Sequence, residues 1–185
     1  MDYLNWLQST LTASAIACGY TSFVIKCWNE RDIEQNEGLL VVTENTINVV
    51  LKALPNTISY YVQSNPYEIT VISEANDIKG TQEILSYFTS TYNYYFQQLS
   101  EKNSDNVTQL NTYKHAYSSA VLVDPYMQQG VTVRGIFLIN ANITVINNVA
   151  DIYSSDGVLG SITVNGVDYK LTSFSFAYVM NPLLS

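Results

Sequence analysis

The segment from Pro66 to Leu99 constrains the fold of this chain more than any other part. Its first residues, 67–74, alternate apolar and polar side chains, which is typical of a strand with one buried face. Apolar side chains then recur every three or four residues, at Ile84, Leu85, Phe88, Tyr92, Tyr95, Phe96 and Leu99. This spacing predicts an amphipathic helix of about five to six turns, with Asn76 or Asp77 as its capping residue. We expect a sheet with this helix packed across it.

The rest of the chain fits one α+β domain over residues 1–185, in which a mostly antiparallel sheet is packed by an N-terminal helix and the long helix. Residues 2–17 predict the N-terminal helix, which Gly19 ends. The predicted strands are 20–28, 39–43, 57–63, 116–123, 131–139, 143–149 and 170–178, with a hairpin turn at Asn165–Gly166. Residues 47–54 fit a helix and a strand equally. Turns or loops are predicted at 29–38, 100–114, 127–130, 140–142 and 151–157. The C-terminal half is β-rich, and residues 116–166 are a candidate elaboration.

Charge excludes one class of partner. The net charge is −8, with only eight Lys and Arg residues and no basic cluster. Sequence-independent nucleic-acid binding needs several side chains that neutralise phosphates, so we expect none here. DNA can still slide past an acidic wall that repels it. No segment has the apolar length that spans a bilayer, and the N-terminus lacks the basic start of a secretory signal, so we expect no membrane association.

No catalytic, cofactor or metal signature stands out. His115 is the only histidine, and its place beside a polar segment predicts a surface imidazole. Gly-x-Ser-x-Gly, phosphate-loop and EF-hand patterns are missing from the sequence. Cys18 and Cys27 are too few for a disulfide framework and are expected to be free thiols. We expect a protein that is not an enzyme and has no cofactor, although Glu68, Glu74 and Asp77 leave an acidic pair open.

Composition favours contacts between protein surfaces. Charged residues make up only 13% of the chain, and tyrosine occurs 15 times; tyrosine is enriched both at interfaces and on strands. The run from Ile136 to Ile139 is apolar on both faces, which predicts burial by the core and by a neighbouring subunit. The densest acidic run holds Glu30, Asp32, Glu34 and Glu37. It is interpreted as a solvated loop, or as a loop that faces a channel or a basic partner.

The order of elements suggests a family. It consists of the N-terminal helix, the strand Glu68–Ile72, Asn76-Asp77, the helix to Leu99 and a closing strand over Tyr169–Tyr178. This order resembles the tail terminator, or tail completion, proteins of long-tailed bacteriophages. The resemblance implies a virion protein that forms a ring, usually hexameric, at the head–tail joint, where it caps the tail tube and docks the connector. Residues 116–166 depart from the family pattern by adding strands, so another neck ring or a tail-tube protein remains an alternative.

A ring subunit needs two different surfaces that match each other. We place one on the helix ending near Leu99 and the other on the strands between Val131 and Val149. The candidate subunit-interface residues are Tyr92, Tyr95, Phe96, Ile136, Leu138 and Ile143. The acidic residues Glu30, Asp32, Glu34 and Glu37 are then candidates for the lumen. From a different class, a β-rich module that binds carbohydrate through tyrosines and Trp6 or Trp28 is a second alternative.

Overall fold

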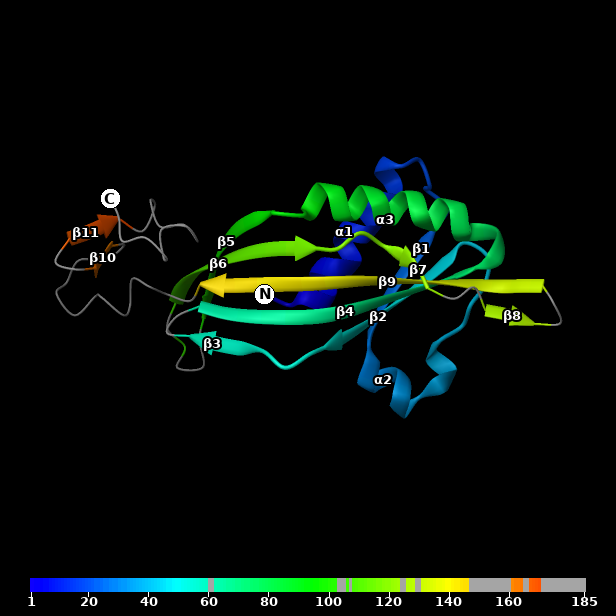
Figure 1. Cartoon of the computed structure of the whole chain (residues 1–185), viewed down its shortest axis with the longest axis horizontal. Coiled ribbons are helices and arrows are strands. Elements are labelled where there is room, and N and C mark those ends of the chain that lie inside the picture. Colours follow the sequence, from blue (N-terminus) through cyan, green and yellow to red (C-terminus); the bar gives the residue numbers. More distant parts are fainter. Residues whose placement is uncertain are drawn as a thin grey trace. The chain divides into compact units, whose positions relative to one another are not determined.

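The computed structural model of the chain describes residues 1–59, 62–102, 106, 108–123, 126–128, 131–146, 161–164 and 167–170. The fold is α+β, with helices on a curled mixed sheet (Figure 1). Its contacts divide it into two compact units. Unit 1 comprises Met1–Pro55, Asn65–Tyr95 and His115–Ile143, and unit 2 comprises Asn56–Ser64, Phe96–Lys114 and the chain from Thr144 onward. The predicted single domain stays a prediction.

Helix α1, Tyr3–Ala17, confirms the predicted N-terminal helix. The Asp2 side chain accepts a hydrogen bond from the backbone N–H of Asn5, which supplies a partner for one of the free donors at the helix start. Gly19 follows the helix with a φ of 86°, a left-handed conformation that glycine adopts without a steric penalty. Leu7, Leu11 and Ala15 form its buried stripe, and the helix packs against β1 and α3.

The sheet is mixed because its first two strands are parallel. β1 (Val24–Asn29) pairs in parallel with β2 (Thr46–Ala53), which pairs antiparallel with β4 (Val62–Glu74). The order continues through β9 (Val131–Ile146) to β6 (Thr108–Tyr117). Residues 47–54, which fitted two interpretations, lie mostly in β2, whereas the strand predicted at 39–43 is wrong. Buried side chains from β2, β4 and β9 form the core, including Val49, Val71 and Phe137.

The long helix is shorter than its apolar spacing predicts. Helix α3 runs from Ile78 to Tyr92, after the 3-10 turn η2 (Ala75–Asp77). The predicted extension to Leu99 is wrong: Tyr94 has a φ of 60°, which breaks the helical path, and Phe96–Lys102 forms strand β5. Asp77 is the N-cap residue of α3, as predicted, but its side chain makes no capping hydrogen bond. Its carboxylate instead accepts a hydrogen bond of 2.6 Å from the backbone N–H of Asn45, which joins the start of α3 to the turn before β2.

Unit 2 is built from strand pairs. β5 pairs with β6 from Phe96↔Lys114 to Lys102↔Thr108, so the loop predicted at 100–114 is wrong for residues 100–102 and 108–114; residues 103–105 and 107 lie outside the described residues. Residues of β5 alternate between exposed and half-buried positions, as a strand with one solvated face requires. β3 (Thr57–Ser59) pairs with the start of β4. β10 (Ser161–Val164) pairs with β11 (Val167–Lys170), and two residues separate them. The turn itself and the predictions at 151–157 and 171–178 lie outside the described residues.

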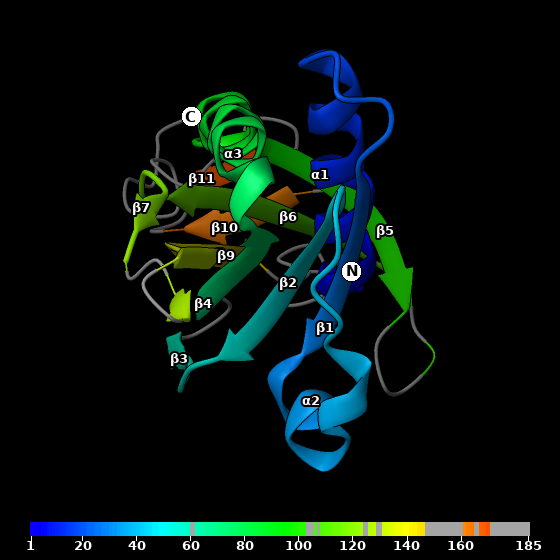
Figure 2. The same cartoon turned by 90° about the vertical axis from the view of Figure 1, so that its right-hand side faces the viewer.

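The predicted turn at 140–142 is wrong because β9 is one continuous strand. Burial alternates without interruption through Phe137, Ile139, Ala141 and Ile143. Asn140 lies on the other face, and its backbone bonds to Ser118. Two short strands, β7 (Val121–Leu122) and β8 (Tyr126–Gln128), also pair with β9, and Figure 2 shows β7 at the margin of the sheet.

Candidate functional site

Strands β7 and β9 bring four apolar side chains together on the outer face of the sheet. Val121 lies opposite Leu138 in the ladder, and the backbone N–H of Val123 donates to the carbonyl of Ile136 over 2.9 Å. Residues directly opposite each other share a face. Ile136 and Leu138 alternate with the buried Phe137 and Ile139, so all four point away from the core. We call Val121, Val123, Ile136 and Leu138 the outer-face patch.

The outer-face patch is open to solvent on its β7 side. Val121 is 58% exposed and Val123 is 44% exposed, while Ile136 and Leu138 are half-buried. Ile136 and Leu138 were predicted to meet a subunit, and they do lie on the face that the core leaves uncovered. Ile143, predicted with them, is instead buried on the core face. The two valines were missed, although the unalternating run Val121-Leu122-Val123 before a proline was a visible signal.

The other three predicted interface residues lie near the end of α3. Tyr92 is half-buried and packs edge-on against Trp6, with ring centroids 5.3 Å apart. Tyr95 is 36% exposed, and its ring stacks on the ring of Trp6. Phe96 is 49% exposed and begins β5. Tyr92 and Tyr95 therefore share one cluster of rings, in which Tyr95 has the larger solvent-facing surface.

Burial of His115 overturns the prediction of a surface imidazole. The residue is 0% exposed, because β6 alternates and places His115 on the same buried face as Tyr113 and Tyr117. Nδ1 of His115 lies 2.9 Å from the hydroxyl of Tyr117, which lies 2.8 Å from the hydroxyl of Tyr3 on α1. Burial lowers the pKa of His115 to about 4 and raises the pKa of Tyr117 and Tyr3 above the ordinary phenol range.

The acidic run forms a short helix rather than a loop. Helix α2, Glu30–Gln35, places Glu30 and Asp32 in its first turn, where the free N–H groups favour negative charge. Glu37 follows in the 3-10 turn η1 (Glu37–Leu39). Asp32 lies 4.0 Å from the guanidinium of Arg31, an exposed pair that contributes little to stability. Figures 1 and 2 show α2 at the end of β1 and β2 that lies away from α3.

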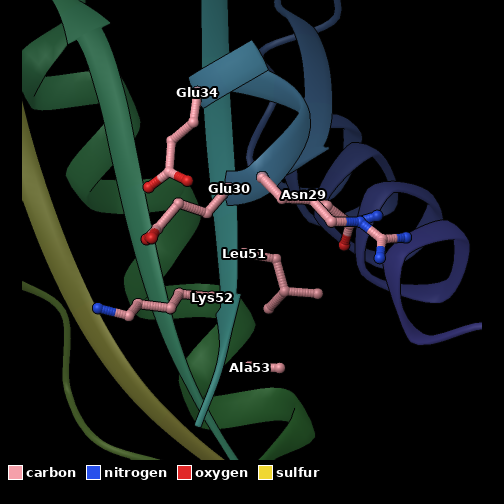
Figure 3. A pocket seen from close by; sticks show the side chains of 7 residues that line it. Asn29, Glu30, Glu34, Leu51, Lys52 and Ala53 are labelled. Atoms are coloured by element: carbon pink, nitrogen blue, oxygen red, sulfur yellow. The ribbon is translucent and has the colours of Figure 1, made fainter.

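A pocket of about 320 Å³ lies between α2 and β2. Its lining residues are Asn29, Glu30, Arg31, Glu34, Leu51, Lys52 and Ala53. Glu30 and Glu34 are one helical turn apart, so they share a face of α2, and Figure 3 shows their carboxylates on the same side as the Lys52 side chain. Of the predicted acidic residues, Glu30 and Glu34 line the pocket, whereas Asp32 does not.

The remaining candidate residues are two tryptophans and two cysteines. The Trp28 indole donates to the side-chain oxygen of Asn48, and Trp6 stacks within 4.3 Å of the His115 ring. Both cysteines are free thiols, and burial raises the pKa of Cys27 to about 12. In the described part of the chain, no three His, Cys, Asp or Glu side chains gather as a metal site, and no helix there has the length and apolarity to cross a membrane.

No protein-family model matches the sequence, and no curated protein is significantly similar to it.

Proposed function

We propose that this chain is a structural, non-enzymatic protein of a tailed phage that works by self-association. It forms a ring at the head–tail joint of the virion, caps the tail tube and docks the connector. The observation that carries the self-association is the outer-face patch. An apolar patch on a sheet that already has a full core on its other side is typical of a protein interaction site. The phage assignment rests on the resemblance in element order.

The outer-face patch supplies one of the two surfaces that a ring requires. Burying Val121, Val123, Ile136 and Leu138 removes apolar area from water, and each fully buried side chain of this size contributes about 1.5–3 kcal/mol. We place the second surface at the end of α3, where Tyr95 is 36% exposed. Two different surfaces make a heterologous contact, which closes into a ring when the rotation per subunit divides a full turn.

Helix α2 is the proposed lumen element. It carries Glu30, Asp32 and Glu34, and Glu37 lies two residues after its end. A channel wall of this charge repels DNA phosphates and lets DNA move without binding. A cryo-electron microscopy map of the assembly tests this: α2 is expected to line the channel, and α2 on the outer rim would contradict it.

Multi-angle light scattering across a range of concentrations, followed by negative-stain imaging, tests the proposed function. We expect the chain to form closed rings, and we expect Val121→Lys to shift the population to monomers because it places a charge in the outer-face patch. Val41→Lys is the matched control, since Val41 is 56% exposed and lies outside the patch. It should assemble as the original chain does.

Three other outcomes of this experiment would change or contradict the proposal. Open tubes of indefinite length would favour the tail-tube alternative, in which the same surfaces stack without closing. Equal assembly of the Val121→Lys and Val41→Lys variants would remove the outer-face patch from the contact. A chain that stays monomeric at its highest soluble concentration would contradict self-association by the chain alone.

A further inference from the structure

A chain of hydrogen bonds links the one histidine to the first turn of α1. It runs from Nδ1 of His115 to the Tyr117 hydroxyl over 2.9 Å and from there to the Tyr3 hydroxyl over 2.8 Å. All three side chains are buried, with exposed fractions of 0%, 7% and 7%. Trp6, from the same end of α1, covers the imidazole at a centroid distance of 4.3 Å. The contact between β6 and α1 is therefore centred on an ionisable ring.

We propose that His115 is a pH-sensitive latch: its neutral form holds the N-terminal end of α1 against the sheet, and its protonation releases α1. This inference is independent of the proposed function. It requires only that the imidazole gains a proton when the contact opens and loses it when the contact closes.

The geometry explains why the closed contact excludes the proton. Neutral histidine has one ring nitrogen that accepts and one that donates, whereas both donate in the protonated form. Nδ1 keeps a partner in either form, because the Tyr117 hydroxyl donates or accepts. Nε2 is buried and has no hydrogen-bond partner among the described residues. A proton there places a charged donor in an apolar site without an acceptor, which is strongly unfavourable.

Among the residues that the structure describes, the titratable groups that face the imidazole do not offset its charge. They are Tyr3 from α1, Tyr117 from β6 and Tyr95 from the segment after α3. Tyr67 of β4 and Cys27 of β1 face Tyr3, and Tyr92 of α3 faces Trp6. These are phenols and a thiol, which are neutral below pH 7. The Trp6 face offers a cation–π contact, yet burial still holds the pKa of His115 at about 4.

The direction of the pH dependence follows from linkage. An unfolded histidine has a pKa of about 6.5, so between about pH 6.5 and pH 4 the open state binds a proton that the closed state does not. The latch contributes its full stability above pH 6.5 and loses it as the pH falls through this window, with the opening constant rising about tenfold per pH unit.

Hydrogen exchange of the full chain tests the latch from about pH 7.5 to about pH 5, which stays above the sequence pI of 4.4. After correction for intrinsic rates, the opening constant of α1 (residues 3–17) should rise at least about tenfold on acidification. The opening constant of α3 serves as the internal reference and should rise less. Equal rises in α1 and α3 would overturn the release of α1.

Two variants and one spectrum separate the latch from general acid destabilisation. His115→Phe keeps a ring and removes the proton site, so the pH dependence of α1 should disappear. Tyr117→Phe keeps the imidazole and breaks the hydrogen-bond chain, so α1 should already be less protected at neutral pH. If His115→Phe keeps the original pH dependence, the carboxylates cause it and the latch is wrong.

Because the chain has one histidine, its Cε1 carbon resonance reports the protonation of the His115 imidazole directly. Half-protonation near pH 6.5 in the folded chain would also overturn the inference.

Discussion

Gly135 of β9 lies against Ile78, the first residue of α3. A Cβ atom at this position would lie 2.8 Å from Cγ1 of Ile78 and 3.0 Å from its Cδ1. Because Cγ1 sits on a branched carbon, it cannot rotate away as freely as the end of a long side chain. We expect Gly135→Ala to destabilise the protein by about 1–3 kcal/mol through overpacking, which exceeds the gain of roughly 0.5–1 kcal/mol from replacing glycine in a strand. Urea denaturation measures the difference.

Substitution of Ile78 provides the control for this clash. In an Ile78→Ala background the close contact is removed and Cδ1 of Leu122 remains at an ordinary contact distance of 3.5 Å, so Gly135→Ala should then cost much less than it does alone. A double-mutant cycle gives this coupling energy. If the two substitutions are additive, the close approach of Ile78 is not the reason for glycine at this position.

His115 shows where residue-level prediction failed. Its neighbours in sequence are polar, and we therefore expected it on the surface. The period-two pattern held the correct signal, because Asn111, Tyr113, His115 and Tyr117 alternate along one strand and are all buried. The signal was missed because the preceding residues are polar on both faces. Ile136 and Leu138 alternate with the buried Phe137 and Ile139, and their predicted contact with a neighbouring subunit stays a prediction.

At the scale of elements, β1 shows how the sheet protects one of its edges. β2 is its only strand partner in the described sheet, so its other edge carries unpaired backbone groups. Gln8 of α1 accepts a hydrogen bond of 2.9 Å from the backbone N–H of Cys27 on that edge. Covering an edge strand in this way prevents it from pairing with another chain.

Removing the Gln8 side chain tests this protection. We expect Gln8→Ala to lower the free energy of unfolding by about 1 kcal/mol, the usual contribution of one hydrogen bond. It should also increase aggregation during refolding, because the β1 edge opens. Ser9→Ala is the matched control on the exposed side of the same helix. Equal refolding yields for the two variants would show that Gln8 does not guard the edge.

Element types were predictable where the periodicity was long and unbroken. Helix α1 and the step from β4 into α3 follow directly from their apolar spacing. The end of α3 was not predictable from spacing, because Phe96 and Leu99 continue the helical pattern while belonging to β5, which its pairing with β6 holds in place. Asn140 and Asn142 led to the prediction of a turn, but in β9 they occupy the face away from the core. At the end of α3 and at residues 140–142, pairing with neighbouring strands determined the backbone conformation.

At the scale of the whole molecule, charge opposes self-association. The net charge is −8, so two copies repel each other, whereas the outer-face patch is uncharged. Raising the salt concentration from about 0.1 M to 1 M shortens the screening length from about 10 Å to 3 Å. We therefore expect sedimentation velocity to show stronger association of the chain at the higher salt concentration. Weaker association at high salt would contradict a contact that depends on apolar burial and would indicate ion pairs instead.

β4 pairs with a strand, β9, that is synthesised well after it. β4 pairs with β2 on one side and with β9 on the other, and α3, β5 and β6 are all synthesised between β4 and β9. On the ribosome the nascent chain therefore keeps an open β4 edge while these elements emerge. Unit 1 includes β9 residues up to Ile143, so it cannot complete its folding before translation has passed this residue.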